Sequence, residues 1–236
     1  MMLSDFHTHI LPGIDDGSPD VETSLAMLRE QARQEISTVV ATPHFYPKSD
    51  TPDRFLQRRS AAYEKLLPAL EADVSLPRLV LGAEVAFFPG ISDSEALAQL
   101  TIGASDYVLV EMPYEPWTDY MLRELRDIYH KQGLMPIVAH LDRYITTLSV
   151  GRTVKQLQAL PVLVQANAEF FLTRSLKRTA LKMLRNDQIH LLGSDCHNMQ
   201  LRPPELGKAA ALIRKHLGDA AISRICQYEN EILPDA

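Results

Sequence analysis

The sequence predicts an α/β fold built around a parallel β-sheet. Short apolar runs of strand length alternate with longer amphipathic runs along the 236 residues, and this alternation is typical of repeated β–α units. The apolar runs are rich in Val, Leu and Ile, as expected of strands buried on both faces. The alternation suits an open doubly wound sheet or a closed barrel. No Gly-x-Gly-x-x-Gly follows the first strand, which argues against a dinucleotide-binding fold.

Seven apolar runs have the length and composition of buried strands. Proline-rich stretches at Pro43–Pro52 and Pro113–Pro116 follow two of these runs and predict loops. In chain order the predicted strands are Leu3–His7, Thr38–Thr42, Leu79–Glu84, Tyr107–Glu111, Met135–His140, Val162–Ala166 and His190–Ser194.

Seven amphipathic runs predict the helices between and after the strands. Asp20 is an N-cap candidate for the first, in which Val21, Leu25 and Leu28 follow helical spacing. The last run is expected to pack on the outside of the fold. The predicted helices are Asp20–Gln34, Asp53–Leu70, Asp119–Lys131, Thr153–Leu160, Ser175–Asn186, Glu205–Leu217 and Ala220–Tyr228.

Composition narrows the class of protein. With 46% hydrophobic and 23% charged residues and no linker or repeat, residues 1–236 are expected to form a single domain. The net charge is −6 without a basic stripe, which argues against nucleic acid as a ligand. No apolar run approaches the ~20 residues of a membrane span, so membrane insertion is not expected. Two cysteines, Cys196 and Cys226, fit a reduced, cytoplasmic setting.

Residues of the metal-ligand type recur at one end of the predicted strands. Six of the seven strands deliver a His or an acid to their C-terminal edge, where α/β barrels build active sites. A single His there is more often a hydrogen-bonded loop residue, but five of the eight histidines share this edge. His130, His190 and His216 lie elsewhere and are expected not to bind metal. The candidate ligands at the edge are His7, His9, His44, Glu84, Glu111, His140, Asp195 and His197.

The His-x-His pair is suited to one cation, because alternation along an extended chain points His7 and His9 to the same side. The following loop adds Asp15, interpreted as a turn or cap residue, and Asp16, interpreted as a ninth ligand. Gly17 lets the backbone turn tightly there. Mixed His and carboxylate ligands suit Zn, Fe or Mn. Nine ligands exceed the needs of one ion, so two or three cations are predicted, an arrangement that can clamp a phosphoryl group.

Two arginines follow strand-end ligands closely. Arg143 lies three residues beyond His140, and Arg202 lies five beyond His197. A guanidinium fork matches the geometry of phosphate oxygens, so both are candidate phosphate-binding residues. The alternative for each is a surface salt bridge.

Three other functions share individual features with this sequence. Cys196 and Arg202 satisfy Cys-x-x-x-x-x-Arg, the signature of thiolate phosphatases, but the intervening loop contains no Gly to cradle phosphate. Amidohydrolases also open with His-x-His, yet they commonly use a strand-end Lys, and none of the predicted strands ends in Lys. A barrel that keeps its metals only for stability or partner binding is the third alternative.

The segment Asp5–Gly17, with its His7-Thr8-His9 and Asp15-Asp16-Gly17 motifs, resembles the opening of PHP-type bacterial tyrosine phosphatases of capsule and exopolysaccharide loci. These belong to the polymerase and histidinol phosphatase superfamily. The Asp-Asp-Gly is the more specific part, because many metallohydrolases share His-x-His. The similarity continues in order through Ala41–His44, Gly82–Glu84, Pro136–His140, Arg143-Tyr144, Ser194–Asn198 and Arg202–Pro204.

The resemblance implies a distorted (β/α)7 TIM-like barrel, the PHP fold, as a single domain with three divalent ions, most often manganese. It implies that a bridging hydroxide attacks phosphorus while Arg143 and Arg202 hold the phosphate and Asp16 takes part in the site. The implied ligand sets are His7, His9, Glu84 and Asp195 for one ion, Glu84, His44 and His140 for a second, and Asp16, Glu111 and His197 for a third.

The substrate implied by the resemblance is phosphotyrosine on an autophosphorylating tyrosine kinase that regulates polysaccharide export. The alternative is a small phosphoester such as histidinol phosphate, whose phosphatases share the superfamily. Those enzymes more often carry His where Asp16 and Glu111 stand here, so they rank second. The oligomeric state and the loops that select the substrate are left open.

Overall fold

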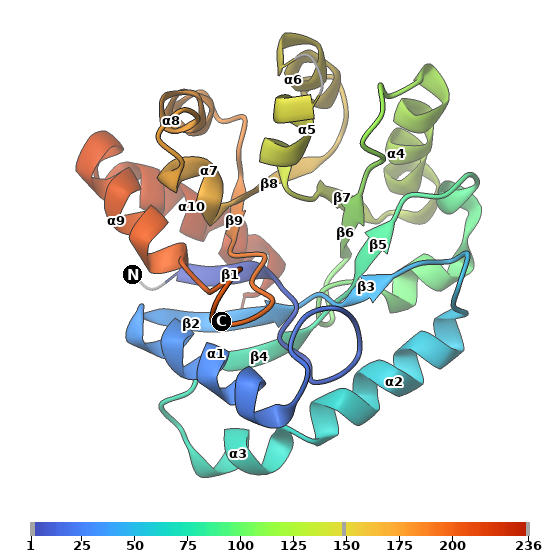
Figure 1. The fold of residues 1–236 in the computed structure, drawn as a ribbon. Helices are drawn as coiled ribbons and strands as arrows, with labels where there is room; N and C mark the ends of the chain where they lie inside the picture. The colour runs from blue at the N-terminus through green and yellow to red at the C-terminus, as the bar shows by residue number, and fades with distance from the viewer. Residues whose placement is uncertain (1–2, 148–149, 235–236) are drawn as a thin grey trace.

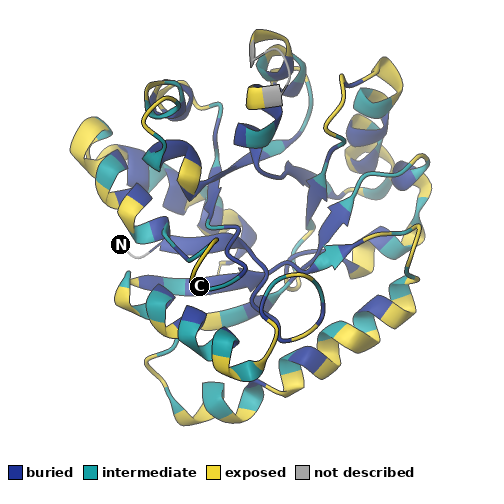
Figure 2. Ribbon diagram, in the orientation of Figure 1, coloured by how far each residue is buried: buried dark blue, intermediate teal, exposed yellow. Residues whose placement is uncertain are grey.

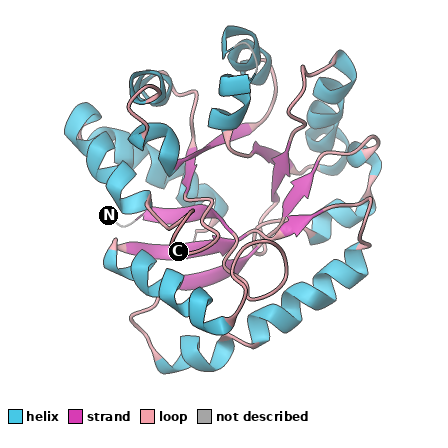
Figure 3. Ribbon diagram, in the orientation of Figure 1, coloured by secondary structure: helices cyan, strands magenta, loops and turns pink. Residues whose placement is uncertain are grey.

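The computed structural model describes residues 3–147 and 150–234 as a curled parallel β-sheet wrapped by helices (Figure 1). All strand pairs in the described part of the chain are parallel, and the strands curve around a common centre with helices on the outside (Figure 3). The α/β prediction is therefore confirmed. Residues 1–2, 148–149 and 235–236 of the predicted 1–236 domain lie outside the described residues.

The strands form two sheets rather than one continuous sheet of seven. The smaller sheet has the order β1-β2-β4, and the larger has the order β3-β5-β6-β7-β8-β9. The strands are β1 (Leu3–Thr8), β2 (Ile36–Ala41), β3 (His44–Phe45), β4 (Arg78–Leu81), β5 (Glu84–Ala86), β6 (Tyr107–Glu111), β7 (Met135–Val138), β8 (Leu163–Asn167) and β9 (Leu191–Gly193).

The predicted strand Leu79–Glu84 is in fact two strands, β4 and β5, which belong to different sheets. Pro43 explains the break, because it has no N–H to continue the ladder of β2. The chain resumes pairing at His44, opposite Glu84 of β5, and Glu84 N donates to the Pro43 carbonyl at 3.0 Å. The break places His44 and Glu84 side by side.

The two sheets meet again where the chain leaves β9. Asp195 N donates to the His7 carbonyl at 2.7 Å, and His9 N donates to the Cys196 carbonyl at 2.9 Å. A parallel bridge between Thr8 and Cys196 joins the same two segments. The first and last strands of the fold are therefore neighbours at the end that carries the ligand-type residues.

The helices follow the predicted order, with one break and two short additions. The predicted helix Asp53–Leu70 is split into α2 and α3 because Pro68 cannot continue a helix and clashes with the carbonyl four residues earlier, at Glu64, where α2 ends. The unpredicted helices α5 and α7 are short; α7 follows β8 directly, and two residues separate α5 from β7. The bounds are α1 (Val21–Arg33), α2 (Pro52–Glu64), α3 (Leu67–Ala72), α4 (Asp119–Gln132), α5 (Leu141–Thr147), α6 (Val150–Gln158), α7 (Ala168–Leu172), α8 (Lys177–Arg185), α9 (Leu206–Leu217) and α10 (Asp219–Ile232), with 3-10 turns at Ile91–Asp93 and Glu95–Gln99.

The core lies on both faces of the curled sheet. The strands are buried and the outer faces of the helices are exposed (Figure 2). A large cluster fills the space between sheet and helices, and a smaller one gathers Phe6, Val40, Leu109 and Ile137 from four strands with Ile232 at the end of α10. None of the described helices is long and apolar enough to cross a bilayer.

Glu229 on α10 is a buried carboxyl outside the ligand cluster, and it sets a testable pH dependence. It is 3% exposed, and its Oε2 accepts from Ser4 N at 3.0 Å. Burial, with the charge of Asp5 adding to it, raises the pKa of Glu229 from 4.5 to about 8. The unfolded chain therefore ionises first, and stability is lost as the pH rises from 4.5 to about 8.

Glu229→Gln is expected to match the wild type in thermal unfolding at pH 5 and to melt about 5 °C higher at pH 9. The gain at high pH arises because the neutral amide avoids the buried charge. Differential scanning calorimetry at both pH values measures it, with the exposed Glu71→Gln as the control. Equal melting temperatures for Glu229→Gln and wild type at pH 9 would contradict the buried-charge explanation.

Candidate metal centre

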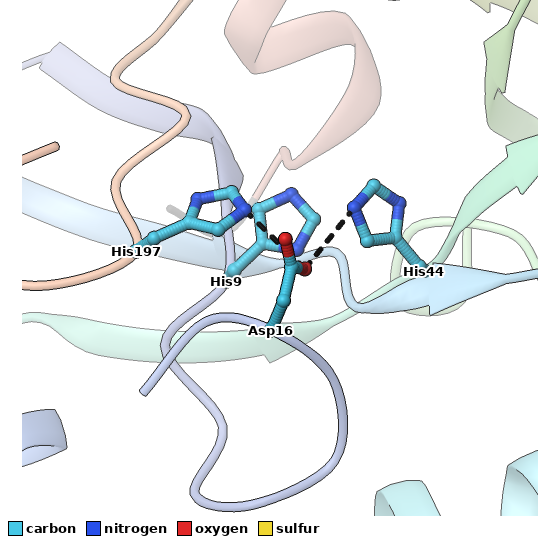
Figure 4. A group of neighbouring side chains, drawn as sticks. All are labelled: His9, Asp16, His44 and His197. Carbon is cyan, nitrogen blue, oxygen red and sulfur yellow. Dashed lines mark ion pairs between the residues drawn. The ribbon is translucent and has the colours of Figure 1, made fainter. Parts of the chain in front are cut away.

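The predicted ligands come together at the C-terminal ends of the strands. Three groups of these side chains have ligand atoms that all lie within 4.8 Å of one another. Figure 4 shows the group of His9, Asp16, His44 and His197, with Asp16 between His44 and His197. The other groups are His7, His9 and Asp195, and His44, Glu84 and Glu111, while His140 Nε2 lies 3.4 Å from Glu111 Oε1.

Glu84 is the centre of the cluster. It is 1% exposed, and four imidazoles surround its two oxygens. Oε2 lies 3.2 Å from His7 Nε2, 3.3 Å from His9 Nε2 and 2.9 Å from His44 Nδ1, and Oε1 lies 2.8 Å from His140 Nε2. A carboxylate placed in this way would help to hold divalent cations together with the surrounding imidazoles.

The three geometric groups differ in membership from the three ligand sets that the resemblance implies. His9 joins Asp16 and His197, and Glu111 lies with His44 and Glu84. The assignment of each side chain to an individual ion therefore stays a prediction. What the geometry gives is one continuous cluster rather than three separate sites.

Asp15 does more than the turn residue it was predicted to be. Its Oδ1 accepts from Gly17 N at 3.0 Å, as in a turn, while its Oδ2 accepts from His9 Nδ1 at 2.8 Å and from His44 N at 3.1 Å. A carboxylate behind an imidazole fixes the ring so that the other nitrogen faces the cluster. Gly17 is required there, because a Cβ at this position would lie 2.2 Å from the His9 carbonyl oxygen.

Strand β8 contributes two amides that the sequence analysis missed. Gln165 Oε1 accepts from His140 N at 2.6 Å and lies 3.3 Å from His7 Nδ1. Asn167 Nδ2 donates to Asp195 Oδ2 at 3.0 Å, and Gln165 Nε2 donates to Asn167 Oδ1 at 3.0 Å. The available signal was the Gln-x-Asn spacing at the end of the one predicted strand that delivers no His or acid to the C-terminal edge.

Close packing also shapes this edge. A Cβ at residue 193 would lie 2.5 Å from His7 Cβ and 2.6 Å from Gln165 Nε2. Gly193 therefore lets β9 approach β1 and β8 closely enough for Asp195 to reach the imidazoles.

Asn167→Ala is expected to weaken metal binding and to lower kcat/KM by roughly 10–100-fold, the usual cost of losing a group that orients a ligand. The reason is that Asp195 loses the amide that fixes one of its oxygens. Competition with a chromogenic chelator measures the metal affinity, and Asn186→Ala on the surface is the control. Unchanged metal affinity in Asn167→Ala would contradict the positioning role.

The electrostatics of the cluster favour cations. Burial lowers the pKa of His9, but its close contacts with the carboxylates of Asp15 and Glu84, and their charges, outweigh burial and raise it to about 10. For the acid Asp195 burial has the opposite effect and raises the pKa. The charges of His7 and His9 outweigh burial and hold the pKa of Asp195 well below its ordinary value. A field strong enough to keep a proton on a buried imidazole also attracts divalent ions, which displace protons when they bind.

The donor set fits divalent metal ions. Glu84 Oε2 and His44 Nδ1 are buried and, among the described residues, neither makes a hydrogen bond, although they lie only 2.9 Å apart. A carboxylate oxygen and an imidazole nitrogen that face each other in this way are suited to share a cation. Imidazole nitrogens mixed with carboxylate oxygens are the ligands of Zn, Fe and Mn sites.

The two predicted arginines lie at the rim of the cluster. Arg143 Nη2 pairs with Asp195 Oδ2, and Arg202 Nη2 lies 2.5 Å from Asp195 Oδ1. Arg202 Nη1 also donates to His197 Nε2 at 2.8 Å. Both guanidinium groups are half-buried, so each has one side toward the cluster and one toward solvent. Both arginines are therefore within reach of a ligand bound at the cluster.

The remaining candidates do not belong to the ligand groups. Cys196 is fully buried, and burial raises the pKa of its thiol well above the ordinary range, which disfavours a thiolate nucleophile. His130 and His216 are exposed on α4 and α9, and His190 Nδ1 accepts from Val164 N at 2.9 Å. None of these three histidines belongs to the ligand groups of the described residues.

Comparison with known proteins identifies relatives over nearly the whole chain. Tyrosine-protein phosphatase YwqE of Bacillus subtilis is 28% identical over 225 residues, which cover 91% of this chain and 85% of YwqE. Tyrosine-protein phosphatase CpsB of Streptococcus pneumoniae is 29% identical over 229 residues, which cover 91% of this chain and 90% of CpsB. The putative tyrosine-protein phosphatase CapC of Staphylococcus aureus is 26% identical over 215 residues, covering 84% and 78% of the two chains.

The fold has a solved counterpart. A crystal structure of YwqE from B. subtilis and CpsB from S. pneumoniae, described as unique metal-dependent tyrosine phosphatases, matches with a TM-score of 0.82 at 23% identity, covering 97% of this chain and 93% of that chain. The family model for capsular polysaccharide synthesis proteins CpsB/CapC matches residues 3–233. The chain is therefore a member of the CpsB/CapC family of capsular polysaccharide synthesis proteins.

Proposed function

We propose that this chain is a metal-dependent protein-tyrosine phosphatase that acts in the control of capsular or exopolysaccharide synthesis. The observation that carries the proposal is the ring of four imidazoles around the buried Glu84 carboxylate, with two arginines at its rim. Membership of the CpsB/CapC family and the names of the relatives, tyrosine-protein phosphatases, support the reaction and the substrate class.

The proposed ligands are the nine residues of the cluster, and the proposed ions are three, with manganese first and iron or zinc as alternatives. The mixed oxygen and nitrogen donors and their continuous arrangement support more than one ion. The ligands are His7, His9, Asp16, His44, Glu84, Glu111, His140, Asp195 and His197.

In the proposed mechanism the side chains of the site bind and orient the phosphate group and neutralise its charge. Bound divalent ions would supply Lewis acidity and a water of lowered pKa. Arg143 and Arg202 bind the non-bridging phosphate oxygens with their guanidinium forks. The side chain of Asp16 is 69% exposed, and its Oδ1 lies 3.5 Å from His44 Nε2. It is therefore at the open side of the cluster. Besides binding metal, its carboxylate can accept a proton from the attacking water there.

The proposed substrate is a phosphotyrosine-bearing protein, specifically an autophosphorylating tyrosine kinase that regulates polysaccharide export. The capsular polysaccharide synthesis family supports this biological setting. A cytoplasmic location belongs to the same proposal, because a chain with only two cysteines, Cys196 and Cys226, fits a reducing compartment.

The proposal also includes the finer architecture, a distorted (β/α)7 barrel of PHP type formed by residues 1–236 as one domain. The parallel strand pairs and the hydrogen bonds that join the segment after β9 to β1 support a closed arrangement.

Cys196→Ser is expected to hydrolyse a phosphotyrosine peptide within about twofold of the wild-type rate, whereas EDTA abolishes hydrolysis by both proteins. The reason is that the buried thiol has no role as nucleophile. Release of inorganic phosphate measures the rates, with a phosphoserine peptide and histidinol phosphate as competing substrates. Loss of activity in Cys196→Ser together with indifference to EDTA would exclude the metal mechanism, and a preference for histidinol phosphate would exclude the protein substrate.

A further inference from the structure

Two exposed tyrosines stand beside the metal cluster, and no hydrolytic step requires them. Among the described residues four tyrosines are substantially exposed: Tyr46, Tyr114, Tyr120 and Tyr129. Tyr120 and Tyr129 belong to α4 on the outside of the fold. Tyr46 and Tyr114 instead each lie directly over an imidazole of the cluster.

Tyr46 follows β3 and covers His44. The two ring centroids are 5.0 Å apart with an interplanar angle of 26°, and 45% of Tyr46 is exposed. Tyr46 also lines a cavity of about 430 Å³ together with Asp16 and His44. One end of this cavity is therefore formed by proposed ligands, and an aromatic ring forms part of its wall.

Tyr114 lies on the loop after β6 and covers His140. The ring centroids are 6.0 Å apart with an interplanar angle of 14°, and 47% of Tyr114 is exposed. Its hydroxyl donates to Glu111 Oε1 at 3.0 Å and accepts from Arg143 Nη1 at 3.1 Å. The ring is held from behind by Tyr144, whose centroid is 5.6 Å away.

Each of the two tyrosines stacks on an imidazole that contacts Glu84. His44 Nδ1 and His140 Nε2 lie 2.9 Å and 2.8 Å from the two oxygens of this carboxylate, and each tyrosine lies one ring further out. A phosphate bound at the cluster would carry its leaving group outward between the two rings. Exposed aromatic rings are costly to leave in water, and they stack favourably on another aromatic ring.

We propose that Tyr46 and Tyr114 form an aromatic rim that receives the phenyl ring of an aryl phosphate, so that the site selects aryl over alkyl phosphoesters. Tyr114 is in addition a positioning residue, because its hydroxyl holds Arg143 against Glu111. The inference rests on the proposed phosphatase function and adds the chemical feature of the leaving group that the site recognises.

The test compares binding of two phosphonates that cannot be hydrolysed, phenylphosphonate and methylphosphonate, to metal-loaded protein by calorimetry. Wild type is expected to prefer phenylphosphonate about tenfold. Tyr46→Ala and Tyr114→Leu are each expected to reduce this preference to about threefold or less, while Tyr46→Phe keeps it. Tyr114→Phe is expected to weaken both phosphonates by the same factor, because it keeps the ring and loses only the hydroxyl that holds Arg143.

Tyr129→Ala is the matched control, since Tyr129 is 40% exposed but belongs to α4; it is expected to keep the wild-type preference. A preference close to one in wild type, or an unchanged preference in both Tyr46→Ala and Tyr114→Leu, would overturn the aromatic rim while leaving phosphatase activity intact. Failure of the proposed function looks different: wild type would bind neither phosphonate and release no phosphate from any ester, and both proposals would fall.

Discussion

Glu84→Gln is expected to lower kcat/KM for a phosphotyrosine peptide by about 10³-fold or more and to leave the protein with less bound metal. Glu84 is, among the described residues, the carboxylate that faces four imidazoles, His7, His9, His44 and His140. An amide of the same shape carries no charge and offers one oxygen instead of two, so it would hold divalent cations less tightly. Elemental analysis after gel filtration, together with phosphate release, measures both effects.

Glu124→Gln is a suitable control for this variant. Glu124 is also buried, and its Oε2 accepts from Ser92 N at 3.0 Å, away from the cluster. It is expected to keep its metal and its activity. Normal metal content and normal turnover in Glu84→Gln would show that the cluster does not bind the catalytic ions through this carboxylate.

Arg143→Ala is expected to lower kcat/KM by about 10²–10³-fold while the metal content stays at the wild-type level. The loss follows because a charge-assisted donor aimed at the phosphoryl oxygens is removed. Arg143→Lys is expected to recover only part of the activity, since an ammonium group keeps the charge but not the bidentate fork. Steady-state kinetics and binding of inorganic phosphate measure the change.

Arg126→Ala on the exposed face of α4 is the control for charge removal. A large loss of metal in Arg143→Ala would assign Arg143 a different role, that of stabilising Asp195, with which its Nη2 forms an ion pair. Full activity in Arg143→Ala would remove it from the phosphate-binding site.

The sequence predicted the order of strands and helices because apolar periodicity reports burial directly. It did not predict where two elements break. Pro43 ends β2 and shifts the chain into another sheet, and Pro68 splits the second helix. Both prolines are evident in the sequence. Whether a proline ends a strand or helix depends, however, on whether the fold requires a hydrogen bond from the backbone N–H at that position. The short helices α5 and α7 have too few residues to show a period.

The candidate ligands were predictable because His and acidic residues are rare at the ends of buried strands, and their clustering at one edge is informative. The side chains that orient these ligands were not predictable from the sequence. Local spacing predicts a turn role for Asp15, yet its Oδ2 also accepts from His9 Nδ1. Gln165 and Asn167 are amides on a strand without ligand-type residues, and only the folded chain places them against His7 and Asp195. Orientation by a second layer of residues leaves little trace in local spacing.

The most direct test is elemental analysis of the purified, active protein, followed by removal and return of its metal. Convergence of imidazoles and carboxylates around Glu84 predicts more than one divalent ion per chain, loss of phosphotyrosine hydrolysis in EDTA and recovery when manganese is added back. Full activity in a sample without bound divalent ions, unchanged by EDTA, would contradict the metal centre and the mechanism built on it.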